Sequence, residues 1–320
     1  MNGIIFAFRF IFANKWKIVL TAWFTLIFIF ILFPFNDLND LISAQISKLT
    51  QNKIFVQFDR MNLSPIGPKI SLEKIFVESG STPTITADDV SVSPSLSSLI
   101  SKQPEGTITA SGILKGDVEI RLKSAAKSES GLARSKLDIQ AKNLSLKEIR
   151  DLAQLPMPLR GTLSITSTAL ADLTFTEQPE AEMAIAILKF EMPSSSVALA
   201  DMGRVNLPEL KFATVELKGK LANGKFIIEN GKLGNNKDEL YGDIKGDLSV
   251  TFQNRDGQIT PILGGYNIDL NLKATTAFKE RAKFFLTFLD GYKSEVADGT
   301  QYKFKIQALA GMPPQFTQLH

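Results

Sequence analysis

The chain has 320 residues, a net charge of only +3 and no cysteine. Its 36 basic and 33 acidic residues are interspersed, so the basic stripe that neutralises phosphates is missing and nucleic acid is not an expected partner. The lack of cysteine excludes disulfides and thiolate sites. The length is sufficient for a sizeable hydrophobic core.

No catalytic constellation is found in the sequence. The only histidine is His320, so neither a histidine-dependent nucleophile nor a histidine metal site can be assembled in an ordered pocket. Glycine-rich phosphate loops and the nucleophile elbow are absent as well. Asp88-Asp89 and Asp238-Glu239 are adjacent carboxylates in strand or turn context, typical of solvated charges rather than of acid/base or calcium sites. We expect no enzyme, no catalytic residue, no cofactor and no metal.

An apolar segment near the start of the chain predicts a membrane anchor. No charge occurs from Ile18 to Asn36, and a helix from Ile18 to Phe35 would be ~27 Å long, close to the ~30 Å hydrocarbon core of a bilayer. The alternatives are a cleaved signal peptide and a buried core helix. A signal peptide has a shorter apolar region and a small-residue cleavage site, and neither is found here. The residues expected to span the membrane include Ile18, Leu20, Trp23, Leu26, Phe30 and Phe33.

The charges that flank this segment predict its orientation. Arg9, Lys15 and Lys17 precede it, whereas Asp37 and Asp40 follow it, and basic residues mark the cytoplasmic side. We therefore expect a cytoplasmic tail (1–17), a transmembrane helix (18–35) and a juxtamembrane helix (36–53). In a bacterium with two membranes, this arrangement predicts a single-pass inner-membrane protein with a periplasmic C-terminal domain.

From Ile54 onward the apolar period changes to two, which is typical of strands. The first β-rich unit is predicted over 54–124, with a short helix at 94–101 and a hairpin that turns at Lys115-Gly116-Asp117. Residues 125–135 are rich in small and charged side chains, so they are either a flexible connector or the tip of a long hairpin. The expected strands are 55–59, 70–77, 85–92, 106–114 and 118–122.

The second β-rich region is predicted over 136–320. Ser145 and Glu148 have the spacing of a capping box, and the helix that they start should end before Pro156. Asn223-Gly224 predicts a type I′ hairpin turn, because both residues accept positive φ. Thr276 is expected to cap an amphipathic helix that either packs over the sheet or docks on a membrane or partner. The expected strands are 137–141, 161–175, 182–191, 215–221, 240–252, 266–274 and 302–309.

These elements predict a mainly β fold in which an elongated antiparallel sheet follows the N-terminal helix. A sheet with one apolar face must cover it, either in a closed sandwich or in an open groove that holds acyl chains or a partner's apolar strand. The sequence leaves both possibilities open. The residues predicted to line such a groove are Ile108, Ile120, Leu122, Leu217, Ile244, Leu248 and Leu270.

Parts of the chain resemble two known groups of proteins. The strand and helix of 85–99, followed by Gly106 to Gly112, resemble the repeated unit of AsmA-like periplasmic β-rich proteins. The glycine-containing segments 231–235 and 240–246, with the ending 298–314, are similar to the type II secretion system protein N (GspN) family. The similarity covers 54–122 moderately and 211–314 best. Residues 123–210 add strands that do not align with the secretion family.

The resemblance implies a non-enzymatic accessory component of the type II (general) secretion system. Such a protein sits in the inner membrane and presents a periplasmic β-domain to other secretion subunits, namely the inner-membrane platform or the secretin. The alternative is an AsmA-like groove that binds or transfers lipid, with phospholipid as the ligand. Because residues 123–210 do not align with the secretion family, the sequence is also compatible with that alternative.

Overall fold

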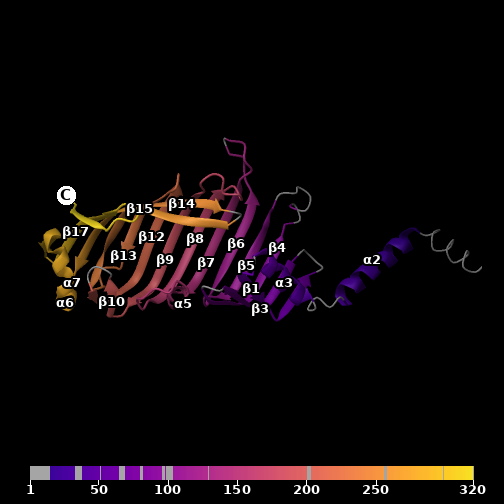
Figure 1. Cartoon of the computed structure of the whole chain (residues 1–320), viewed down its shortest axis with the longest axis horizontal. Helices are drawn as coiled ribbons and strands as arrows, with labels where there is room; N and C mark the ends of the chain where they lie inside the picture. The colour runs from indigo at the N-terminus through magenta and orange to yellow at the C-terminus, as the bar shows by residue number, and fades with distance from the viewer. Residues whose placement is uncertain are drawn as a thin grey trace, which may run out of the picture.

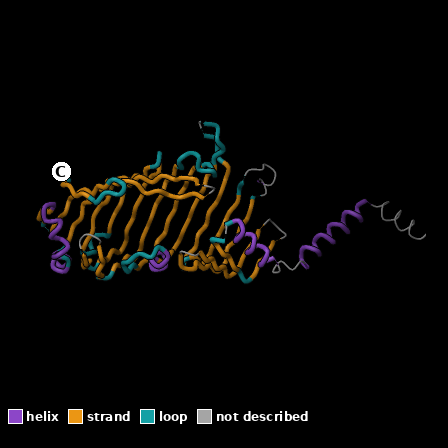
Figure 2. Tube along the Cα trace, viewed as in Figure 1, coloured by secondary structure: helices purple, strands orange, loops and turns teal. Residues whose placement is uncertain are grey.

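The computed structural model describes residues 15–32, 38–50, 52–64, 69–79, 82–95, 98, 104–128, 130–199, 203–255, 258–297 and 299–319. Within these ranges the protein is mainly β and is built around one large antiparallel sheet. The strands lie side by side along the long axis of the molecule, roughly in chain order (Figures 1 and 2). The mainly β, antiparallel prediction is thereby confirmed.

The sheet has 16 strands, and its order is β1-β3-β4-β5-β6-β7-β8-β9-β12-β13-β14-β15-β17-β16, with β2 on β3 and β18 on β17. A separate hairpin, β10-β11, is inserted between β9 and β12. The strands are β1 (Ile54–Gln57), β2 (Arg60–Ser64), β3 (Lys69–Ser79), β4 (Thr82–Pro94), β5 (Gly106–Ile113), β6 (Gly116–Ser124), β7 (Ser135–Ser145), β8 (Arg160–Ala171), β9 (Glu180–Met192), β10 (Ser195–Leu199), β11 (Gly203–Leu207), β12 (Leu210–Ala222), β13 (Lys225–Leu233), β14 (Leu240–Arg255), β15 (Gln258–Ala274), β16 (Lys293–Val296), β17 (Gly299–Ala308) and β18 (Gln315–Gln318).

The described helices are α2 (Lys15–Leu32), α3 (Asn39–Leu49), α5 (Leu146–Leu152), α6 (Thr276–Arg281), α7 (Lys283–Leu286) and the 3-10 helix η2 (Thr287–Tyr292). Helix α2 lies beyond the β1–β3 end of the sheet, α3 lies at that end, and α6 and α7 lie at the opposite end (Figure 1). No helix in the described part of the chain is long and apolar enough to cross a membrane.

Each end of the sheet carries a hydrophobic core. At one end Phe58, Met61, Ile75 and Ala87 are buried, and Ile42 of α3 packs against them. At the other end the buried residues of α6, α7 and η2 pack on β15 and β17; they are Phe278, Ala282, Leu286 and Leu289, with Ala274, Tyr302 and Phe304 from the sheet. Within the described ranges these are the two clusters of buried apolar residues.

Several local predictions are confirmed. Asn223 and Gly224 have φ of 52° and 71°, as a type I′ turn requires, and they join β12 to β13. Residues 125–134 join β6 to β7. These two strands pair with each other, from Asp117 opposite Lys142 to Ser124 opposite Ser135. Of the two interpretations of this segment, the hairpin tip is therefore correct. The two β-rich regions belong to one continuous sheet.

Other local predictions are wrong in detail. Ser145 occupies the N-cap of α5, but its side chain makes no capping hydrogen bond. The other half of the box is missing as well, because the Ser145 N–H donates to the Leu114 carbonyl at 2.9 Å and Glu148 forms an ion pair of 2.8 Å with Lys115. The cap of α6 is Thr275, whose side chain accepts from the Phe278 N–H, rather than Thr276. The predicted short helix 94–101 falls mostly outside the described residues; Pro94 ends β4 and Ser98 is helical.

Candidate functional site

Mostly apolar side chains, interrupted by Ser167 and a few glycines, form rows across one face of the sheet. Because side chains alternate between faces along a strand, the strand register determines which residues share a face. One row is Val90, Ala110, Val118, Ala141, Ile165, Ile185, Leu217, Gly231, Ile244, Leu270 and Phe304. The next is Val92, Ile108, Ile120, Ile139, Ser167, Met183, Gly219, Ile228, Gly246, Ile268 and Ile306. We call the surface that carries these rows the apolar face.

Two further rows extend the apolar face on either side. One contains Leu122, Leu137, Ala169, Ala181, Leu221, Phe226, Leu248 and Tyr266. The other contains Leu144, Leu163, Ile187, Val215, Leu233, Gly242, Leu272 and Tyr302. The apolar face therefore extends over several side-chain rows along the strands, and it crosses the sheet from β4 to β17.

The middle of the apolar face is only partly covered: Ala141, Val215 and Leu221 are buried, whereas other side chains of the same rows are not. Ile120, Ile165, Ile185 and Leu217 belong to the intermediate class of exposure, and Ile108 is 43% exposed. At the two ends, by contrast, the helices cover this face. Ile42 of α3 packs on a cluster that Leu72 and Val90 also contact, and α6 to η2 pack on Phe304 and Tyr302. The described structure thus has a covered apolar surface at each end and an incompletely covered one between them.

All the residues predicted to line a groove lie on the apolar face. Ile108 and Ile120 belong to one row, Leu122 and Leu248 to another, and Leu217, Ile244 and Leu270 to a third. Their role in binding a ligand stays a prediction.

The residues predicted to span a membrane lie in or next to α2. Helix α2 contains Ile18, Leu20, Trp23, Leu26 and Phe30, and the side chains of Leu20 and Trp23 are exposed. Phe33 lies outside the described residues. The membrane role of this segment stays a prediction.

The opposite face of the sheet is polar. Thr109, Glu119 and Gln140 are cross-strand neighbours on it, and so are Asp138, Thr168 and Glu182. Cross-strand ion pairs join Lys225 to Asp247 at 3.2 Å and Lys305 to Asp269 at 3.5 Å. Exposed pairs of this kind contribute little to stability, but they identify the polar face as the solvated one.

The β14–β15 hairpin extends beyond the neighbouring strands and crosses the rim of the sheet (Figure 1). The side chain of Gln178 in the β8–β9 loop donates to the Phe252 carbonyl at 3.0 Å and accepts from the Phe252 N–H at 2.8 Å. Asn254 Nδ2 donates to the Thr174 carbonyl at 2.7 Å. These bonds fix the last residues of β14 to a loop that lies several strands away in the sheet.

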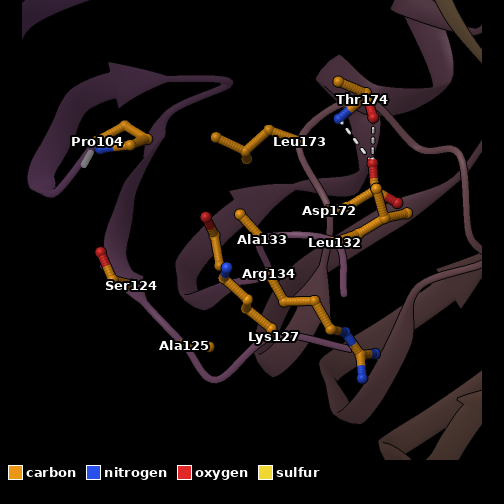
Figure 3. Close-up of a pocket in the computed structure, with 11 residues that line it drawn as sticks. Pro104, Ser124, Ala125, Lys127, Leu132, Ala133, Arg134, Asp172, Leu173 and Thr174 are labelled. Atoms are coloured by element: carbon orange, nitrogen blue, oxygen red, sulfur yellow. Dashed lines mark hydrogen bonds between the residues drawn. The ribbon is translucent and has the colours of Figure 1, made fainter. Parts of the chain in front are cut away.

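A cavity of about 380 Å³ opens at the same rim, between the β6–β7 tip and the β8–β9 loop. Pro104, Leu132 and Leu173 contribute apolar walls, and Ser124 and Ser135 contribute hydroxyls. In Figure 3 the ammonium group of Lys127 points into this cavity, whereas the guanidinium of Arg134 points away from it. We call it the rim pocket.

Asp172 holds one wall of the rim pocket in place. The residue is 3% exposed, and its carboxylate accepts hydrogen bonds from the N–H groups of Thr174, Thr176 and Glu177 at 2.9, 3.1 and 2.8 Å, and from the Thr174 hydroxyl (Figure 3). Burial by itself raises the pKa of Asp172, but the hydrogen bonds outweigh it, so the pKa lies below its ordinary value of 3.8. Asp172 is therefore ionised at neutral pH with its oxygens occupied.

Replacing Asp172 with alanine is expected to lower the free energy of unfolding by about 1–3 kcal/mol at pH 7, because three loop N–H groups lose their acceptor. The folded pKa is depressed, so the stabilisation is complete above the ordinary pKa of 3.8 and is lost as the pH falls through the lower folded value. Urea unfolding at pH 7 and pH 3 checks this, with the exposed Asp117→Ala as control. A difference between wild type and Asp172→Ala that grows on acidification would contradict it.

Sequence reasoning missed the rim pocket. Most of its residues come from the segment 125–134, for which the sequence predicts only a connector or a hairpin tip, and from the β8–β9 loop, which carries no motif. Pro104 comes from the segment before β5. A serine-rich, lysine-containing hairpin tip next to an apolar strand was the available signal.

The chain was also compared with known proteins. Comparison with protein-family models, with curated proteins and with solved structures finds no match.

Proposed function

We propose that this protein is a non-enzymatic lipid-binding protein of the bacterial envelope, which holds acyl chains on its apolar face. The observation that carries the proposal is the set of apolar rows, incompletely buried, that cross the sheet between two helix-covered ends. A protein that used this face only as its own core would bury it with further elements along its whole length.

The dimensions of the face suit acyl chains. Neighbouring strands are ~4.8 Å apart, so the ten inter-strand steps from β4 to β17 give a row ~48 Å long. One acyl chain covers half of the ~30 Å hydrocarbon core, or ~15 Å. Each methylene removed from water contributes ~0.8 kcal/mol, so ten of them contribute ~8 kcal/mol before the cost of immobilising the lipid.

The chemistry of the face favours an acyl chain over a polypeptide. The N–H and C=O groups of the central strands are paired within the sheet, so the apolar face offers side chains only. An extended peptide laid on it would bury its own backbone groups without partners, at a cost of several kcal/mol. A hydrocarbon chain has no such groups.

The proposed location rests on the sequence. The uncharged run from Ile18 to Phe35, with basic residues before it and Asp37 and Asp40 after it, supports an anchor in the inner membrane with a cytoplasmic N-terminus. The sheet would then lie in the periplasm, next to the bilayer that supplies its lipid.

Photo-crosslinking with a phospholipid that carries a diazirine on its acyl chain tests both parts of the proposal. The full chain is irradiated in its native membranes, digested, and searched for lipid adducts by mass spectrometry. We expect adducts in residues 18–35 and in strands β6 to β14. Adducts confined to 18–35 would contradict the lipid-binding face, whereas adducts only in the strands would contradict the anchor.

The second candidate is the accessory role in type II secretion that the resemblance implies. It is favoured by the edge strands β16 and β18, which pair with β17 on one side and whose residues are exposed, because free edges accept a partner's strand. Gentle detergent extraction should then recover the inner-membrane platform or the secretin with this chain. Recovery of the chain without either would count against this role.

A further inference from the structure

The rim pocket lies at the end of the apolar face. Ser124, Ser135 and Ala171 are cross-strand neighbours, and each is two residues along its strand from Leu122, Leu137 and Ala169. Residues two apart in a strand share a face, ~6.6 Å from each other. The pocket therefore opens where the rows of the apolar face change from aliphatic side chains to hydroxyls.

The polar groups of the rim pocket are partly unused. The hydroxyl oxygen of Ser124 is buried and has no hydrogen-bond partner within the described ranges, although its N–H donates to Glu105 at 3.4 Å. Lys127 is exposed and its ammonium group has no ion pair among the residues that the structure describes. A buried hydroxyl without a hydrogen-bond partner destabilises the folded protein. A bound acceptor would remove this penalty.

The other charges near the pocket are already engaged. Arg134 pairs with Glu180 at 3.2 Å and donates to the Leu170 carbonyl at 3.4 Å. The carboxylate of Asp172 is occupied by its own loop, and the carboxylate of Glu105 accepts from the Ser124 N–H. The positive charge that faces the pocket in Figure 3 is thus the ammonium group of Lys127. It favours an anionic ligand.

We infer that the rim pocket binds the phosphate of a lipid headgroup, while the acyl chains of the same lipid extend over Leu122 and Leu137 onto the apolar face. Lys127 supplies a charge-assisted hydrogen bond to the phosphate, and the Ser124 hydroxyl donates a second one. This inference rests on the proposed function. It adds that the preferred ligand is a phospholipid rather than a neutral lipid with the same chains.

Binding of two lipids with identical acyl chains tests the inference. Fluorescent phosphatidylglycerol and fluorescent diacylglycerol are titrated into the full chain in detergent, with inorganic phosphate as competitor. Lys127→Gln should weaken phosphatidylglycerol binding by about fivefold to tenfold and leave diacylglycerol binding unchanged, because one charge-assisted bond is lost. Ser124→Ala should weaken it by about twofold to fivefold. Lys123→Gln, which removes a charge from the opposite face of the same strand, should have no effect.

The outcomes separate the inference from the proposed function. Equal binding of both lipids, unaffected by Lys127→Gln, would overturn the headgroup site and leave the acyl-binding face intact. A loss of both lipids in Lys127→Gln would show a structural effect and also overturn the site. Displacement of phosphatidylglycerol by submillimolar phosphate would identify the ligand as the free anion instead. Binding of neither lipid by wild type would overturn both proposals.

Discussion

Replacing Ile165 with aspartate is expected to lower lipid binding at least tenfold. Ile165 lies in the middle of the apolar face, between Ala141 of β7 and Ile185 of β9, and it is half-buried. A carboxylate at this position would be covered by an acyl chain without any compensating partner, which costs several kcal/mol. Since 1.4 kcal/mol corresponds to a factor of ten in affinity, a tenfold loss is the minimum. Titration with a fluorescent phospholipid measures it.

The control is the adjacent residue of the same strand. Thr166 points to the polar face, where Gln140 and Ala184 are its cross-strand neighbours. Thr166→Asp introduces the same charge one residue away and should leave lipid binding unchanged. Circular dichroism establishes that both variants retain the sheet. Equal losses in the two variants would refute the assignment of the lipid to the apolar face.

Replacing Phe278 with alanine is expected to lower the free energy of unfolding by about 3–5 kcal/mol. Phe278 is 2% exposed and belongs to the cluster that fixes α6, α7 and η2 on the end of the sheet. Its removal leaves a cavity that the surrounding side chains fill only partly. Urea unfolding, followed by far-ultraviolet circular dichroism, measures the loss.

The matched control for this cluster is Phe284, which is 67% exposed on the neighbouring helix α7. Phe284→Ala removes the same number of atoms from a side chain that packs mainly edge-on against Phe288, so stability should change by less than about 1 kcal/mol. If the two variants unfold at the same urea concentration, α6 to η2 do not form a core with β15 and β17.

The apolar face could be predicted from the sequence because it depends only on alternation. A strand such as Val118 to Leu122 places every second residue on one face whatever its neighbours are, so the inward positions Ile108, Ile120 and Leu122 follow from the period alone. The register of β12 and β13 was equally accessible, because Asn223-Gly224 restricts the turn between them to a two-residue loop.

What the sequence did not reveal has no local pattern that would encode it. The short edge strands β2, β16 and β18 carry too few residues for a period to be recognised, and they form because β3 and β17 present unpaired edges. The predicted capping box does not form, because the Ser145 N–H donates to the Leu114 carbonyl and Glu148 pairs with Lys115. The rim pocket combines residues of the β6–β7 tip and the β8–β9 loop with Pro104 before β5. Asp172 has no sequence signal that distinguishes it from a solvated turn residue.

The claim that acyl chains lie on one face of this sheet is tested most directly by a crosslinker scan along β9. A photoreactive amino acid is placed singly at positions 183 to 187 of the full chain, the membranes are irradiated, and lipid adducts are quantified by mass spectrometry. We expect strong adducts from Met183, Ile185 and Ile187, which share the apolar face, and weak ones from Ala184 and Ala186 between them. A yield that is uniform along the strand, or strongest at positions 184 and 186, would contradict the account.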